Sequence, residues 1–104
     1  MVDTGQVVEL TTERTVLGRA PEAHGEWAHA VAVPVQDPGR SVSKTHLGVI
    51  STAQGLWIQD FGSTNGTTIL LPDGTEMAVE GPEASLLPEG ACIRMGERLI
   101  LVER

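Results

Sequence analysis

The sequence predicts an all-β fold, an antiparallel β-sandwich of many short strands. Short β-branched and apolar runs recur along the chain at roughly ten-residue spacing, which is typical of sandwiches and barrels. Twelve glycines and six prolines among 104 residues supply turn signals between these runs. No stretch of useful length shows the apolar periodicity of an amphipathic helix. We expect a single domain over residues 1–104, because domains run to roughly 100–200 residues.

The first part of the chain predicts three strands. Residues 7–11 and 15–17 are β-branched runs and indicate a first pair of strands. Residues 30–35 contain three valines together with Pro34. Proline favours an edge strand here, because it lacks the N–H that a central ladder needs. A strong turn signal follows at residues 37–40.

The second part of the chain predicts five strands, at residues 47–51, 56–60, 68–71, 91–94 and 98–102. Asn65-Gly66 predicts a hairpin turn before the third of these, because both residues tolerate the positive φ of a type I′ turn. We expect Trp57 in the core and Trp27 partly exposed in a loop. Cys92 is the only cysteine, which excludes an intrachain disulfide and a cysteine-based zinc site. We expect it to be a buried, inert thiol.

The charge of the chain bears on the class of partner. A net charge of −7 argues against nucleic acid and against an anionic membrane surface, because both need a basic face. Three of the seven basic residues, Arg19, Arg40 and Lys44, lie in or beside the candidate segments described below, and none occurs in residues 45–93. Because exposed charges further apart than about 8 Å are largely screened, we expect this local positive charge to matter more than the total.

The N-terminal residues show no basic and apolar pattern of a signal peptide. The longest apolar run, residues 30–35, is far shorter than the ~18 residues of a membrane span. These observations favour a cytoplasmic location without direct membrane insertion. The absence of tyrosine, beside abundant alanine, glycine and valine, favours a bacterial source. Because the last expected strand reaches the end of the chain, we also expect a module of a larger protein.

Three short segments carry the residue types that surround a bound phosphate. They are residues 17–19 (Leu-Gly-Arg), 43–46 (Ser-Lys-Thr-His) and 60–67 (Asp-Phe-Gly-Ser-Thr-Asn-Gly-Thr). Each lies at the edge of an expected strand, where loops can converge on a ligand. In this order they resemble the forkhead-associated (FHA) domain, a β-sandwich module that binds phosphothreonine peptides. The resemblance covers about residues 14–103.

The resemblance implies a ligand site formed by loops at one end of the sandwich. Arg19 and Ser43 would contact the phosphate, and Thr64 would add a hydroxyl group or support. Asn65 would bond the peptide backbone, and we include Ser63 of the same loop among the binding residues. The chemistry agrees, since arginine offers a planar fork of donors that matches phosphate bidentately and serine and threonine add hydroxyl donors.

Other residues would support this site or modify it. The resemblance gives a structural role to Gly18, His46 and Gly66. Ser41 stands where the family often has a basic residue, so Arg40 and Lys44 are the candidates for that charge. The stretch between Arg19 and Ser43 is longer than the family pattern and contains Glu22 and Glu26, which would weaken phosphate binding if they faced the site.

We therefore predict a phosphothreonine-reading adaptor that recruits a protein phosphorylated by a Ser/Thr kinase, or the kinase itself. The first alternative is an assembly or structural domain with the FHA fold that binds a partner without phosphate. A weaker suggestion is self-association through a phosphorylated threonine within residues 11–15, which rests on threonine density alone.

An enzymatic function is the remaining alternative. Residues 41–44 match the S-x-x-K pattern of penicillin-binding proteins and class A β-lactamases, and residues 63–65 resemble S-D-N, but the third element, K-T-G, is absent. Ser43 and His46 as a nucleophile and base would also need an orienting acid and an oxyanion hole. We predict no catalysis, no cofactor and no metal.

Overall fold

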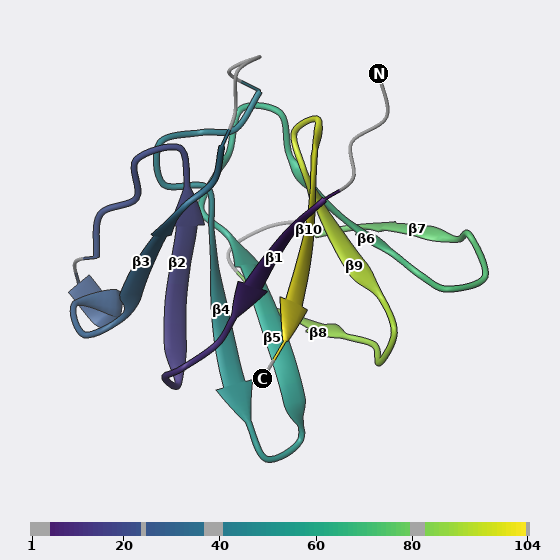
Figure 1. The fold of residues 1–104 in the computed structure, drawn as a ribbon, viewed down its shortest axis with the longest axis horizontal. Coiled ribbons are helices and arrows are strands. Elements are labelled where there is room, and N and C mark those ends of the chain that lie inside the picture. Colours follow the sequence, from purple (N-terminus) through teal and green to yellow (C-terminus); the bar gives the residue numbers. More distant parts are fainter. Residues whose placement is uncertain (1–4, 24, 37–40, 80–82, 104) are drawn as a thin grey trace.

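The computed structural model describes residues 5–23, 25–36, 41–79 and 83–103 of the chain. It is a sandwich of two sheets (Figure 1). The strands are β1 (Gln6–Glu9), β2 (Arg14–Gly18), β3 (Val31–Pro34), β4 (Leu47–Thr52), β5 (Gly55–Asp60), β6 (Thr67–Leu70), β7 (Glu76–Ala78), β8 (Ser85–Leu87), β9 (Cys92–Met95) and β10 (Arg98–Glu103). A short 3₁₀ helix, η1 (Gly25–Trp27), lies between β2 and β3.

Each sheet has five strands. Sheet A has the order β1-β10-β9-β6-β7, and sheet B has the order β3-β2-β4-β5-β8. The all-β sandwich fold is confirmed, with one difference from the expected antiparallel pairing. At one edge of each sheet the pairing is parallel, between β1 and β10 and between β2 and β3. The two N-terminal strands do not pair with each other, because the chain leaves sheet A after β1 and enters sheet B with β2.

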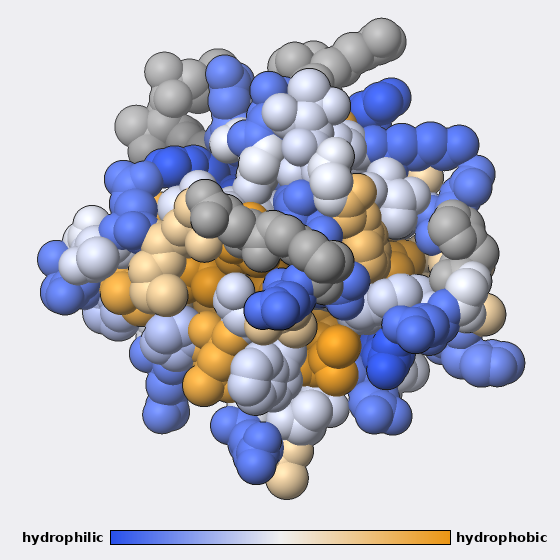
Figure 2. All heavy atoms as spheres, turned by 180° about the vertical axis from the view of Figure 1, so that it is seen from behind, coloured by the Kyte–Doolittle hydropathy of each residue, from blue (hydrophilic) through white to orange (hydrophobic). Residues whose placement is uncertain are grey.

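The core lies between the sheets and is aliphatic. Sheet B contributes Leu17, Leu47, Val49 and Ile58, and sheet A contributes Ile69, Ile93, Met95 and Ile100, each at most 1% exposed. Successive side chains on a strand point to opposite faces, so these alternate positions share the inner face. Figure 2, the view from behind, shows apolar residues near the middle of the outer surface on that side and hydrophilic residues around its margin.

The three aromatic residues of the chain lie on the outer face of sheet B instead of in the core. Trp57 is beside Ile58 on β5 and therefore points outward, half-buried, with its Nε1–H donating to Thr52 Oγ1 at 3.3 Å. Trp27 is only 7% exposed. It packs on Gly48, where any Cβ would overlap the indole ring, and makes an edge-to-face contact with Phe61 at 5.3 Å between ring centroids. The expectations for both tryptophans were wrong.

Other sequence-based expectations meet mixed outcomes. The strand with Pro34 is an edge strand, as expected, since β3 ends the order of sheet B. Asn65-Gly66 is not a hairpin turn, because β5 and β6 belong to different sheets. The segment between them crosses from one sheet to the other, with Gly66 at a φ of 82°. Cys92 is only partly buried.

Three elements have no counterpart among the expected strands, namely η1, β7 and β8, each of three residues. The turn expected at residues 37–40 lies outside the described residues. Within the part of the chain that the structure describes, no helix has the length and apolar character needed to cross a membrane.

Candidate functional site

Three strand ends bring the candidate segments together at one end of sheet B. Leu17 of β2 pairs with Leu47 of β4, and Leu47 pairs with Asp60 of β5. The loop after β2, the loop before β4 and the crossing after β5 therefore begin side by side. They meet at the upper end of the molecule in Figure 1. The turn between β1 and β2 and the hairpin between β4 and β5 lie at the opposite end.

These loops surround a small surface depression of about 160 Å³. It is lined by Arg19, Ser41, Val42, Ser43, Thr64 and Asn65, and we call it the Arg19 depression. Four of the residues expected to bind phosphopeptide thus lie around one concavity. Among the described residues that line the depression, Arg19 carries the charge. The depression is therefore suited to an anion.

Arg19 is held at the depression by its backbone and by one side-chain contact. Its N–H donates to Ser43 O at 3.0 Å, and Ala20 N–H donates to Lys44 O at 3.0 Å. The preceding Gly18 lies so close to the Lys44 carbonyl that any Cβ would overlap it, so glycine is required for this approach. Arg19 Nε donates to Val42 O at 3.4 Å, and the structure shows no acceptor among the described residues for its terminal nitrogens.

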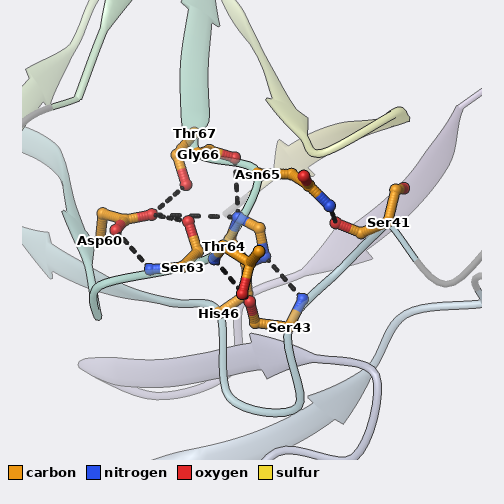
Figure 3. Close-up of polar contacts among 9 residues, drawn as sticks. All are labelled: Ser41, Ser43, His46, Asp60, Ser63, Thr64, Asn65, Gly66 and Thr67. Carbon is orange, nitrogen blue, oxygen red and sulfur yellow. Dashed lines mark hydrogen bonds and ion pairs between the residues drawn. The ribbon is translucent and has the colours of Figure 1, made fainter.

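The ring of His46 lies between two of the loops and joins them (Figure 3). Its ring is fully buried, and its Nδ1 accepts the Ser43 N–H at 3.0 Å. Its Nε2 lies 2.9 Å from Gly66 O. Because Nδ1 is an acceptor, the neutral tautomer with its hydrogen on Nε2 satisfies both bonds. His46 is therefore a brace between the loop before β4 and the crossing after β5.

The polar groups of the depression are partly engaged and partly open (Figure 3). Thr64 N–H donates to Ser43 Oγ at 3.1 Å. The Ser43 hydroxyl uses an oxygen lone pair in this bond and keeps its proton for another acceptor. Asn65 Nδ2 donates to Ser41 O at 2.8 Å, which fixes the amide and leaves its Oδ1 as an acceptor. Both loops thus present donors and an acceptor in fixed positions.

Asp60 organises the crossing after β5 (Figure 3). Ser63 Oγ and Thr67 Oγ1 each donate to Asp60 Oδ1 at 2.6 Å, and Ser63 N–H donates to Oδ2 at 2.9 Å. Burial raises the pKa of Asp60, but these hydrogen bonds together outweigh burial and hold its pKa below the ordinary value. The hydroxyl of Ser63 is thus committed to Asp60, and Ser63 does not line the Arg19 depression.

The two further candidate cations are Lys44 and Arg40. Lys44 Nζ forms an ion pair with Glu22 Oε1 at 2.9 Å, and neither side chain lines the Arg19 depression. Glu22 therefore does not oppose an anion from within the depression, as the sequence left open. Arg40 lies outside the described residues.

Ser41 supports the depression, a role that its sequence context did not predict. Its side chain is buried, its Oγ accepts the Glu97 N–H at 2.9 Å, and its carbonyl accepts from Asn65. Gly96 packs so tightly on Ser41 that any Cβ would overlap its backbone. The only sequence signal for Ser41 was its place two residues before Ser43.

Within the described ranges, no group of three histidine, cysteine or carboxylate residues is placed to hold a metal ion. The chemistry of the depression is that of hydrogen-bond donors around a single guanidinium. Such an arrangement is complementary to an anion.

The FHA domain family model matches residues 15–96, most of the chain. The chain belongs to the FHA domain family. FHA domains are protein-interaction modules that generally bind phosphopeptides. No curated protein matches the chain.

Solved structures of FHA domains share the fold. One is the solution structure of the FHA domain of a hypothetical protein from Arabidopsis thaliana, with a TM-score of 0.57 and 23% identity over 88% of this chain and 69% of that one. Another is the FHA-2 domain of an ABC transporter from Mycobacterium tuberculosis, with a TM-score of 0.50 and 21% identity over 95% of this chain and 75% of that one. At these identities the likeness concerns the fold.

Proposed function

We propose that this FHA domain binds phosphothreonine peptides in the Arg19 depression and recruits proteins phosphorylated by a Ser/Thr kinase. The observation that carries the proposal is the meeting of Arg19, Ser43, Thr64 and Asn65, from three separate loops, around one concavity. The partner is a substrate of such a kinase or the kinase itself, met in the cytoplasm. The domain acts by recruitment and not by catalysis.

The chemistry of the depression supports a phosphate as its ligand. A phosphorylated threonine carries about −1.5 to −2 charges and three strong acceptor oxygens. The terminal nitrogens of Arg19 supply a bidentate donor pair, and the Ser43 and Thr64 hydroxyls supply further donors. Each hydrogen bond to a charged group contributes about 1.5–3 kcal/mol. Since such contributions are not additive, we expect phosphorylation to raise affinity by about two to three orders of magnitude.

Asn65 fits a second task, contact with the peptide backbone. Its Nδ2 is tied to Ser41 O, so its Oδ1 is held in one orientation and can accept an N–H from an extended peptide. The same bond restricts the amide before binding, which lowers the entropy cost of ordering it. We assign Asn65 to positioning the residues next to the phosphothreonine.

A phosphate-independent assembly domain is the competing function. One observation favours it: Val7 of β1 and Leu101 of β10 are paired neighbours on sheet A and are 56% and 38% exposed. Such neighbours form a small apolar spot that a second protein could cover. Association of this kind is driven by apolar burial and does not weaken as salt is raised.

The test is fluorescence anisotropy with a degenerate peptide library in phosphothreonine, phosphoserine and unmodified forms. We expect tight binding of the phosphothreonine form, and a loss of at least about tenfold in Arg19→Ala and in Ser43→Ala. Arg94→Ala is the matched control, because it removes an arginine from the outer face of sheet A. Equal binding of the three peptide forms would refute phosphate dependence. Unchanged binding in both site variants would refute the assigned depression.

A further inference from the structure

The loops that form the Arg19 depression also form a second, larger hollow of about 440 Å³ beside it. The chain after β2 contributes Arg19 to the depression and Glu22, Glu26 and Trp27 to the hollow. Ser43 lines the depression, and Thr45 lines the hollow. We call this second cavity the Trp27 hollow. The two cavities share no lining residue, but the same two loops contribute residues to both.

The Trp27 hollow has the opposite electrostatic character to the depression. Trp27 and Phe61 provide aromatic wall, Gln59 provides an amide, and Glu22 and Glu26 provide carboxylates. No basic residue among those that the structure describes lines it. Carboxylates beside aromatic rings are complementary to a cation, which gains from the charge and from the ring quadrupole.

The chain itself shows that the groups of the Trp27 hollow hold cations. The Arg14 guanidinium lies 5.0 Å from the centroid of the Trp27 ring, and its Nη1 donates to Glu26 O at 3.4 Å. Lys44 Nζ lies 2.9 Å from Glu22 Oε1. Neither basic residue is among those that line the hollow.

The distance between the cavities suits one peptide. Arg19 and Glu22 are three residues apart, which limits their Cα separation to about 11 Å, and Ser43 and Thr45 are two apart, within about 7 Å. The Glu22 N–H donates to Thr45 Oγ1 at 3.1 Å, which ties the two loops together at the hollow. An extended peptide spans such distances in about three or four residues.

We propose that the Trp27 hollow is a subsite for an arginine or lysine side chain within about four residues of the phosphothreonine. The preferred ligand then carries a phosphate that is complementary to Arg19 and a neighbouring cation that is complementary to the carboxylates of the hollow. This inference rests on the proposed function, since the phosphate anchors the peptide. It accounts for the placement of Glu22 and Glu26 in the long stretch after Arg19.

The test is a set of degenerate phosphothreonine libraries in which one position at a time, within four residues of the phosphothreonine, is fixed as arginine or as glutamine. We expect arginine to bind about fivefold more tightly than glutamine at one position or at two adjacent ones, which is the upper range for an exposed charge pair. In Glu26→Gln we expect this preference to fall below about twofold, and in Glu22→Gln to fall by less, because Lys44 already engages that carboxylate.

The control is Glu89→Gln, which makes the same change of charge at the turn before β9 and should leave the preference intact. Circular dichroism confirms that each variant is folded. No arginine preference at any position would overturn the subsite, and so would an equal loss in Glu26→Gln and Glu89→Gln, which would indicate a general charge effect. Tight binding of the glutamine libraries in these cases would leave phosphate recognition standing. Equal binding of unmodified peptides would instead refute the proposed function.

Discussion

At the scale of single residues, Asp60 and His46 give the site its shape although neither lines the depression. Asp60 accepts three hydrogen bonds from the crossing after β5, and His46 joins that crossing to the loop before β4. Ser43, Thr64 and Asn65 are therefore presented by loops whose own hydrogen bonds are satisfied internally. We infer that the depression is preformed in the unbound domain.

The substitution Asp60→Asn tests this internal support. Asparagine keeps the shape but replaces one charged acceptor with an amide donor facing Ser63 and Thr67. We expect the free energy of unfolding at pH 7 to fall by about 1–3 kcal/mol. Because the folded-state pKa of Asp60 is lowered, its stabilising effect is present above the unfolded pKa of about 3.9 and is lost as pH falls through the folded value.

The difference between wild type and Asp60→Asn should therefore shrink below about pH 4. Urea titrations at several pH values measure it, and Glu89→Gln, in an exposed turn, serves as the comparison. A difference that stays constant down to the lowest pH at which both proteins fold would contradict the role of the carboxylate.

Arg19→Lys separates charge from geometry at the depression. Lysine keeps the positive charge but loses the planar fork that matches a phosphate bidentately. We expect phosphothreonine peptide affinity to fall by about tenfold, with the melting temperature unchanged. Isothermal titration calorimetry measures the affinity. Wild-type affinity in this variant would show that charge alone is recognised.

At the scale of elements, close backbone approach positions the loops. β2 leads into the depression because Gly18 has no side chain. The Lys44 carbonyl lies in the space that a Cβ of residue 18 would fill. Gly96 does the same for Ser41, between β9 and β10, and so links sheet A to the loop before β4. The site is thus built on contacts between both sheets.

Gly18→Ala tests the approach of β2 to this loop. The added methyl overlaps backbone atoms of Lys44, which cannot move without shifting Ser43. We expect a loss of about 1–3 kcal/mol of unfolding free energy, together with loss of phosphothreonine binding. Gly25→Ala is the matched control, since its Cβ meets nothing within 4 Å and it bears only the cost of a left-handed φ, about 1–2 kcal/mol. Retained binding in folded Gly18→Ala would contradict this account.

At the scale of the whole molecule, sequence patterns predicted the sandwich and the loops of the site, because both depend on local signals. Short strands, turn residues and the three motif segments are each readable within a few residues. Sequence patterns gave wrong expectations where contacts between distant segments determine the structure. Residues 56–58 are all apolar, so alternation does not show that Ile58 points inward and Trp57 outward. Asn65-Gly66 reads as a hairpin only if its flanking strands share a sheet.

The supporting contacts of Ser41 were beyond sequence reasoning for the same reason. Ser41 and Glu97 are 56 positions apart, and no local pattern links them. The Trp27 hollow likewise forms only when η1 folds onto Gly48. The sequence named the candidate binding residues and, through the family resemblance, His46 as a support, but it did not identify Ser41 or Asp60 as supports.

The net charge of −7 opposes a phosphopeptide over long distances, whereas Arg19 attracts it at contact. Raising salt from about 0.1 M to 1 M shortens the Debye length from about 10 to 3 Å. We expect contact attraction to dominate, so that affinity for a phosphothreonine peptide falls several-fold over this range. Anisotropy titrations measure it. An affinity that does not fall would favour apolar association over phosphate recognition.

The most direct measurement is an NMR titration of the ¹⁵N-labelled domain with a phosphothreonine library and with its unmodified counterpart. With the phosphorylated library, we predict that the amide shifts concentrate in residues 18–20, 41–46 and 63–66, around the Arg19 depression. The unmodified library should leave these amides in place. Shifts confined to sheet A, or the same shifts with both libraries, would contradict phosphate recognition at this site.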